Sequence, residues 1–173
     1  MLHKTTDGLN LYYEVQGNIQ SDKTLVFLNG LSQTTIAWGL VTIHFQNYKL
    51  VLCDFIFQGQ SDKIGESRDF DEHAADVKGL LDQLGIFNPI LIGISYGSLV
   101  AQNFAVNYPN QINTLILLST FAHKTPYFNA IELSWQNALD SGGYDLMLDV
   151  MLPFVLSENY FAKPLSTLSF LLS

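Results

Sequence analysis

The feature that most constrains the fold of this sequence is the segment 93–97, Gly-Ile-Ser-Tyr-Gly, in which a serine stands between two glycines. It follows an apolar run, residues 89–92, that is typical of a buried strand, and it precedes residues 98–105, whose apolar face predicts a helix. Glycines at a strand-to-helix corner let the two elements approach closely, because they have no Cβ. The spacing therefore predicts a strained turn that presents the hydroxyl group of Ser95, in the position of a nucleophile.

The rest of the chain up to residue 120 alternates apolar runs with amphipathic segments. Continuous apolar runs predict parallel strands that are covered on both faces, at 24–28, 49–54, 89–93 and 112–118. Helical spacing predicts the elements between them, at 34–45, 72–84 (with Asp71 as its cap) and 98–108. Asp7 and Gly8 predict the turn of an antiparallel hairpin at the N-terminus. We therefore expect a three-layer α/β/α fold with a mostly parallel sheet.

The pattern changes after residue 120. Residues 128–139 and 144–156 have helical character, aromatic side chains are frequent, and no further segment has strand character. We predict a core domain over residues 1–120 and a helical lid or cap over residues 121–173. An amphipathic helical core and a lid over an apolar acyl pocket are compatible interpretations, because a lid helix has one face for each.

Composition excludes several classes of function. Hydrophobic residues make up 48% of the chain, the net charge is −8, and no basic run exists, which argues against a nucleic-acid partner. No apolar stretch is long enough for a membrane span, and the N-terminus has no signal-peptide pattern, so we expect a cytoplasmic protein. The single cysteine, Cys53, is expected in the core. No histidine or carboxylate pair has metal-ligand spacing, so neither a metal nor a cofactor is expected.

These elements resemble the α/β-hydrolase fold. The matching residues are the elbow 93–97, the loop Asn29-Gly30-Leu31 with Trp38 downstream, and Asp54 followed by Gly59-Gln60-Ser61-Asp62. The resemblance implies that Ser95 attacks a carbonyl carbon of a small ester or acyl substrate. It also implies that the backbone N–H groups of Tyr96 and Leu31, or of the adjacent Ser32, stabilise the oxyanion. Gly93 and Gly97 shape the elbow, and Asn29, Gly30 and His123 are candidates for lining the site.

The general base is missing from the pattern. In the family the acid and the histidine follow the serine along the chain. Only His123 follows Ser95, directly after the next predicted strand, which suits a lid hinge better than a base. We therefore expect the acid and the histidine beyond residue 173, a chain truncated before its last strands, and self-association through the exposed sheet edge that truncation leaves.

Two departures from the family pattern leave alternatives open. Asn29 stands where many members have histidine, and Ile56 and Phe57 stand where many have arginine and glycine. Asn29 and the run 57–61 resemble instead the bacterial synthase that joins two hydroxyacyl chains into a rhamnolipid precursor, which would make the chain an acyltransferase. The missing histidine also leaves open a non-catalytic protein of hydrolase-like fold that binds an acyl ligand or a partner.

Overall fold

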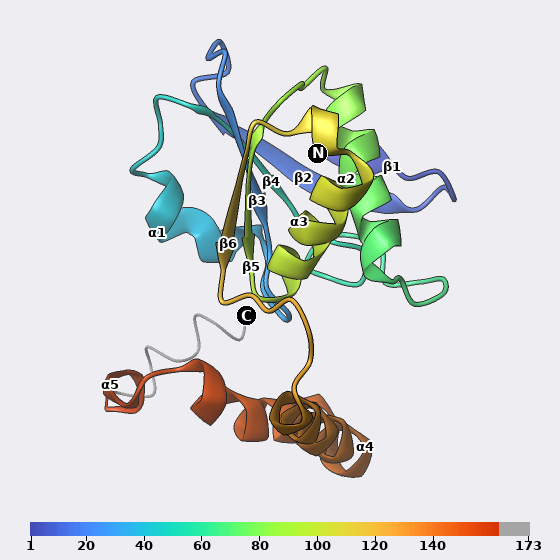
Figure 1. The fold of residues 1–173 in the computed structure, drawn as a ribbon, viewed down its shortest axis with the longest axis vertical. Coiled ribbons are helices and arrows are strands. Elements are labelled where there is room, and N and C mark those ends of the chain that lie inside the picture. Colours follow the sequence, from blue (N-terminus) through green and yellow to red (C-terminus); the bar gives the residue numbers. More distant parts are fainter. Residues whose placement is uncertain (163–173) are drawn as a thin grey trace. The chain divides into compact units, whose positions relative to one another are not determined.

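The computed structural model describes residues 1–162 (Figure 1). The chain divides into two compact units, Met1–Thr120 and a second that begins at Phe121. The last part of the predicted cap range 121–173, with the apolar run after Pro164, lies outside the described residues. No helix within residues 1–162 combines the length and the apolar character needed to cross a membrane.

The described part of the first unit forms a six-stranded sheet with the order β1-β2-β4-β3-β5-β6. The strands are β1 (Leu2–Lys4), β2 (Asn10–Gly17), β3 (Thr24–Leu28), β4 (Lys49–Cys53), β5 (Ile90–Ile94) and β6 (Thr114–Leu118). β1 and β2 form an antiparallel hairpin, β2 pairs antiparallel with β4, and the four strands β4, β3, β5 and β6 are parallel. The predicted fold class is confirmed.

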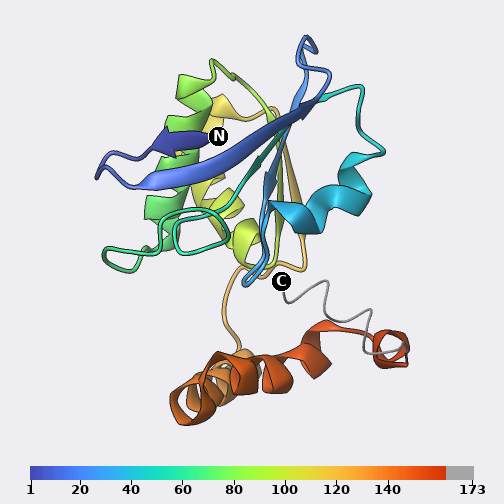
Figure 2. The same ribbon diagram turned by 180° about the vertical axis from the view of Figure 1, so that it is seen from behind.

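Helices cover both faces of this sheet. α2 (Phe70–Gln83) and α3 (Tyr96–Asn107) lie on one face, and the short helices η1 (Thr35–Trp38) and α1 (Gly39–Thr42) lie on the other (Figures 1 and 2). Alternate side chains of a strand point to opposite faces. In β3, accordingly, Val26 and Leu28 enter the core under α2 and α3, whereas Leu25 and Phe27 pack on the side of Trp38. Both sets are buried, which explains why the sequences of the central strands are continuous apolar runs.

The predicted helix over residues 34–45 is wrong in its extent. The segment forms one turn of 3-10 helix, η1, and a four-residue helix, α1. β-Branched residues, which lose rotamer freedom in a helix, are frequent in it: Thr34, Thr35, Ile36, Val41, Thr42 and Ile43. In addition, the backbone N–H of Thr35 donates to the Asp54 carboxylate at 2.7 Å, so a long-range bond fixes the first turn.

The cap of α2 is Asp69, and the prediction of Asp71 is wrong. The Asp69 carboxylate accepts from the Glu72 N–H at 2.8 Å, and the Glu72 carboxylate accepts from the Asp69 N–H at 2.8 Å. This reciprocal pair requires an acid three residues after the cap, a spacing that Asp69 and Glu72 satisfy. Asp71 instead lies in the first turn of α2 and accepts from the side chain of Asn107 on α3 at 2.9 Å.

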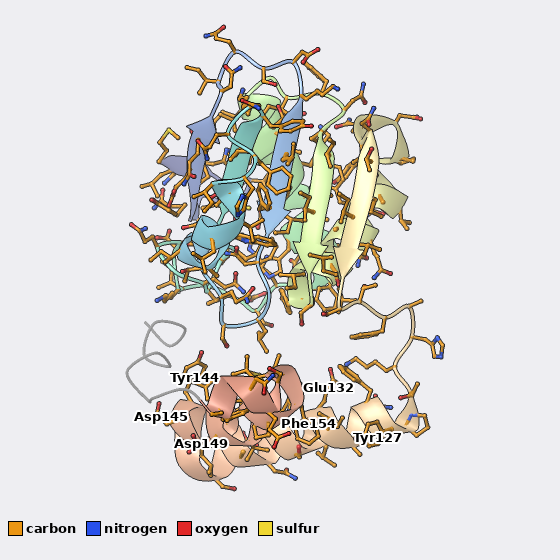
Figure 3. The ribbon with its side chains drawn as sticks, turned by 90° about the vertical axis from the view of Figure 1, so that its left-hand side faces the viewer. Tyr127, Glu132, Tyr144, Asp145, Asp149 and Phe154 are labelled. Atoms are coloured by element: carbon orange, nitrogen blue, oxygen red, sulfur yellow. The ribbon has the colours of Figure 1, made fainter. Side chains whose placement is uncertain are left out.

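The second unit is built on α4 (Pro126–Val155), followed by α5 (Glu158–Phe161). Gly143 interrupts α4 with φ 75° and ψ −167°, so the two helices predicted at 128–139 and 144–156 are present as two halves joined by a kink. The halves share a small core of Ala138, Met147, Leu148 and Met151. Figure 3 shows the aromatic side chains Tyr127, Tyr144 and Phe154, each at least half exposed, together with the acidic Glu132, Asp145 and Asp149.

β6 is an edge strand of the described sheet, because it pairs only with β5 there. One face of β6, with Leu115 and Leu117, packs on the core, and the other carries the exposed Ile116 and Leu118. An apolar edge strand has free backbone donors and acceptors and is a template for pairing with another chain.

We expect this chain to self-associate through β6. The mass measured by size-exclusion chromatography with light scattering should increase over a tenfold range of protein concentration, and Ile116→Lys should suppress the increase because a charge blunts the edge. Val106→Lys is the matched control, because Val106 is also exposed but lies on α3. A monomeric wild type at every concentration would contradict the expectation.

Candidate active site

Ser95 lies at the corner between β5 and α3. Its backbone has φ 50° and ψ −117°, a left-handed conformation that costs free energy for a residue with a side chain. Two backbone hydrogen bonds hold the corner: the Ser95 N–H donates to the Leu118 carbonyl at 2.9 Å, and the Ser98 N–H donates to the Ser95 carbonyl at 2.9 Å. The Ser95 residue is exposed, and its hydroxyl has no hydrogen-bond partner among the described residues.

The two glycines of the elbow are required by close contacts between backbones. A Cβ on Gly93 would lie 2.4 Å from the Gly97 carbonyl oxygen and 2.7 Å from the Ser98 Cα. A Cβ on Gly97 would lie 2.3 Å from the Leu28 oxygen and 2.5 Å from the Asn29 oxygen. All of these atoms belong to the backbone and cannot rotate away, so only glycine allows α3 to approach the end of β3.

We expect Gly97→Ala to lower the free energy of unfolding by about 2 kcal/mol or more, since the added methyl group must push α3 away from β3. Gly39→Ala is the matched control, because a Cβ at Gly39 meets no atom within 4 Å and its φ is −53°. Urea denaturation of both variants measures the difference. Equal stability of the two would show that α3 can shift without cost.

The loop after β3 lies beside the elbow because β3 and β5 are neighbours, with Leu28 paired to Gly93. A Cβ on Gly30 would be 3.5 Å from the Ile94 oxygen, which measures how near this loop comes to the end of β5. The N–H groups of Leu31 and Tyr96 donate to no acceptor among the described residues. The predicted oxyanion donors therefore lie in the loop after β3 and at the start of α3, and neither N–H is used in a hydrogen bond among the described residues.

The Asn29 side chain is fully buried and serves the scaffold. Its amide nitrogen donates to the Cys53 carbonyl at 3.0 Å and to the Asp54 carboxylate at 3.1 Å, and its amide oxygen accepts from the Trp38 indole at 2.8 Å. Each of these bonds joins the end of β3 to β4 or to η1. The side chain of Asn29, a position expected to line the site, thus lies in the core.

The aromatic ring of Tyr96 connects the elbow to α2. It packs against Phe55, Phe70 and the ring of His73, with centroid distances of 6.0, 5.0 and 5.7 Å. Burial raises the pKa of Tyr96. An aromatic cluster therefore holds the side chain of Tyr96, whose backbone N–H is a candidate oxyanion donor.

Two ionisable groups on α2 are buried next to this cluster. Burial, together with the nearby Arg68 guanidinium, lowers the pKa of His73 to about 4, and its Nδ1 has no partner among the described residues. Burial raises the pKa of Asp76 to about 6, although Arg68 Nε lies 3.1 Å from its carboxylate. Arg68 also binds both carboxylate oxygens of Asp7, at 2.8 and 2.9 Å.

The two groups should change the free energy of unfolding in opposite directions with pH. His73 has its pKa lowered from 6.5, so the unfolded chain binds more protons and stability declines as pH falls through 6.5 toward 4. Asp76 has its pKa raised from 3.8, so the folded chain binds more protons and stability increases as pH falls through 6 toward 4. In the wild type these two trends offset each other.

Single substitutions should expose each trend. Relative to the wild type, His73→Phe should gain stability as pH falls from 7 to 5, and Asp76→Asn should lose it, each by no more than about 1.4 kcal/mol per pH unit. Urea denaturation at several pH values measures the slopes. Parallel profiles for the wild type and both variants would contradict the assignment.

The histidines of the described residues have partners or surroundings other than the Ser95 hydroxyl. His3 pairs with the Gln83 side chain at 2.6 Å, and His73 is enclosed in the aromatic cluster. His44 follows α1, and His123 is an exposed residue of the second unit. None of the four forms a hydrogen bond with Ser95 in the part of the chain that the structure describes. The described residues also contain no cluster of three or more histidine, cysteine, aspartate or glutamate side chains able to hold a metal ion.

Sequence reasoning missed Gln33 and Gln58. The Gly30 N–H donates to the Gln33 side-chain oxygen at 2.9 Å, and the Gln58 side-chain nitrogen donates to the Gly30 carbonyl at 3.1 Å. The only signal in the sequence was their position in the two loops that carry the family resemblance.

Comparisons with known proteins identify the fold. A sequence model of the alpha/beta hydrolase fold matches residues 23–147. Epoxide hydrolase 4 of Mus musculus is 31% identical over 123 residues, which are 69% of this chain and 34% of that protein. The 3-oxoadipate enol-lactonase 2 of Acinetobacter baylyi is 33% identical over 121 residues, which are 68% of this chain and 44% of that protein.

Solved structures of hydrolases share the fold. MGS-M2, an alpha/beta hydrolase enzyme from a deep-sea metagenome library, is 29% identical with a TM-score of 0.85, over 94% of this chain and 59% of that one. The enol-lactonase from Burkholderia xenovorans has a TM-score of 0.86 at 20% identity, over 99% and 65% of the two chains. This chain thus spans less than half the length of the curated relatives and less than two thirds of these structures.

Proposed function

This chain belongs to the α/β-hydrolase fold family, and we propose that it carries the nucleophile and oxyanion site of a serine hydrolase of carboxylic esters or related acyl compounds. Ser95 is the nucleophile, and the N–H groups of Leu31 and Tyr96 are the oxyanion donors. Residues 1–120 supply the catalytic core and residues 121–173 the cap. The observation that supports this is an exposed serine at a strained corner, beside two backbone donors left without partners.

The chemistry of acyl transfer uses each of these groups. The Ser95 oxygen forms a bond to the carbonyl carbon, its proton passes to a base, and the carbonyl electron pair moves onto oxygen. Two preorganised N–H groups stabilise that charge. When the carbonyl re-forms, the bond to the leaving alcohol breaks and the alcohol takes the proton, leaving an ester on Ser95. Water then attacks the carbonyl carbon of this ester, the bond to the Ser95 oxygen breaks, the carboxylic acid leaves, and the serine oxygen regains a proton.

A serine nucleophile favours acyl substrates over epoxides, although relatives of both kinds exist. Attack of a serine oxygen on an epoxide carbon forms an ether, which has no carbonyl carbon for water to attack. Attack on an ester or lactone forms an acyl-serine, which water can cleave. The same acyl-serine could also pass its acyl group to the hydroxyl of a hydroxy-fatty acid, as in the acyltransferase alternative. Ester and lactone chemistry therefore fits this chain better than epoxide opening.

A second candidate is a non-catalytic protein that binds an acyl ligand. It is favoured by one observation: no described histidine bonds to Ser95, so the hydroxyl has no histidine base among the described residues to take its proton. Under this alternative the oxyanion loop would bind a carbonyl oxygen without forming a covalent bond.

Activated esters distinguish the two. We expect p-nitrophenyl acetate to acetylate Ser95 slowly, at about 10³-fold above the rate in water, because the oxyanion donors act without a base. Mass spectrometry of peptides locates the acetyl group, and Ser95→Ala should abolish the label there. His123→Ala should leave the rate unchanged. Equal acetylation of the wild type and Ser95→Ala would favour the binding protein, and a loss of rate in His123→Ala would identify His123 as the base.

A further inference from the structure

Three hydrogen bonds hold the peptide groups on either side of Gly30. The carbonyl oxygen of Gly30 accepts from the Gln58 side-chain nitrogen at 3.1 Å and from the Gln33 backbone N–H at 3.2 Å. On the other side, the Gly30 N–H donates to the Gln33 side-chain oxygen at 2.9 Å. Gly30 is buried, and a Cβ there would lie 2.8 Å from that Gln33 oxygen, so a side chain at this position would have to displace the Gln33 amide.

The Gly30 carbonyl and the Leu31 N–H belong to the same peptide group. In a planar trans peptide the C=O and N–H bonds point in opposite directions. A donor that fixes the direction of the Gly30 oxygen therefore fixes the direction of the Leu31 hydrogen. A hydrogen bond accepted by the carbonyl also polarises the amide and makes its N–H a stronger donor.

Holding Gln58 in this orientation has a cost. Its side-chain oxygen is buried and has no partner among the described residues. Phe57, directly before it, has φ 75°, a conformation that is unfavourable for an aromatic residue. Turning the amide over would place the Gln58 oxygen against the Gly30 oxygen, which is repulsive. A buried acceptor without a partner is destabilising, and its presence calls for an explanation beyond stability.

We propose that Gln58 is a positioning residue that aims the Leu31 N–H at the oxyanion, with Gln33 fixing the other side of Gly30. The proposal rests on the proposed function for the identity of the oxyanion. It adds a residue from the loop after β4 that acts through a backbone group and touches no reacting atom. The donor side of the amide does the positioning, so an isosteric side chain without a donor should fail.

The first test is independent of activity. The ¹H–¹⁵N NMR spectrum of the chain reports the Leu31 amide, whose shift should change in Gln58→Met and in Gln58→Glu, because neither side chain donates to Gly30 at neutral pH. Lowering the pH should protonate the introduced carboxyl in Gln58→Glu and restore its donor, returning the Leu31 shift toward that of the wild type. A purely structural role for the side chain would not show this recovery. Gln60→Met, an exposed position on the same loop, is the control and should leave Leu31 unchanged.

The second test uses phenylboronic acid, whose boron becomes tetrahedral and negatively charged on a serine oxygen and so mimics the oxyanion. Its affinity, measured by ¹¹B NMR, should fall about tenfold in Gln58→Met, less than the 10²–10³-fold typical of losing a donor outright. The affinity of benzamide, which forms no such adduct, should stay the same. An unchanged Leu31 shift or an unchanged boronate affinity in Gln58→Met would overturn the proposal. If the wild type forms no Ser95-dependent adduct, the proposed function fails, and the Leu31 shifts alone decide on Gln58.

Discussion

The buried carboxylate of Asp54 is the interaction on which the candidate site depends. It accepts hydrogen bonds from the Thr35 N–H at 2.7 Å, the Asn29 side chain at 3.1 Å and the Gln60 N–H at 3.0 Å. A buried charge is tolerated only when its acceptors are satisfied, and these three donors come from three segments. The one group therefore joins the loop after β3, the start of η1 and the loop after β4. Gly30 and Gln58 lie in two of the segments that it joins.

Glycine at position 59 belongs to the same arrangement. A Cβ there would lie 2.0 Å from an Asp54 oxygen, so the loop can fold over the carboxylate only at a residue with no side chain. Ser61 completes the closure by donating to the Asp54 carbonyl at 2.6 Å and accepting from the Tyr12 N–H at 2.8 Å. The loop after β4 is thus attached both to the carboxylate and to the hairpin strand β2.

Features that depend on local sequence were predictable. The elbow follows from two glycines around a serine, and the central strands follow from apolar runs, because both are properties of a few adjacent residues. The failures involve partners far apart in the chain. Residues 34–45 do not form one helix, in part because the Thr35 N–H donates to Asp54. The Asn29 side chain lies in the core because it forms hydrogen bonds with Trp38 and β4. Gln58 acts on Gly30, 28 residues earlier, and no local pattern indicates such a pairing.

The corner at Ser95 is held by main-chain contacts and not by the Ser95 side chain. The glycines, the strained φ angle and the bond to Leu118 all belong to the main chain, and the hydroxyl projects from the corner without a partner among the described residues. The strain of the corner therefore belongs to the backbone, and the side chain that projects from it can differ. A different side chain can therefore stand at this position while the main-chain contacts of the corner stay the same. Such independence is one physical basis for a family in which lactonases and epoxide hydrolases share one scaffold.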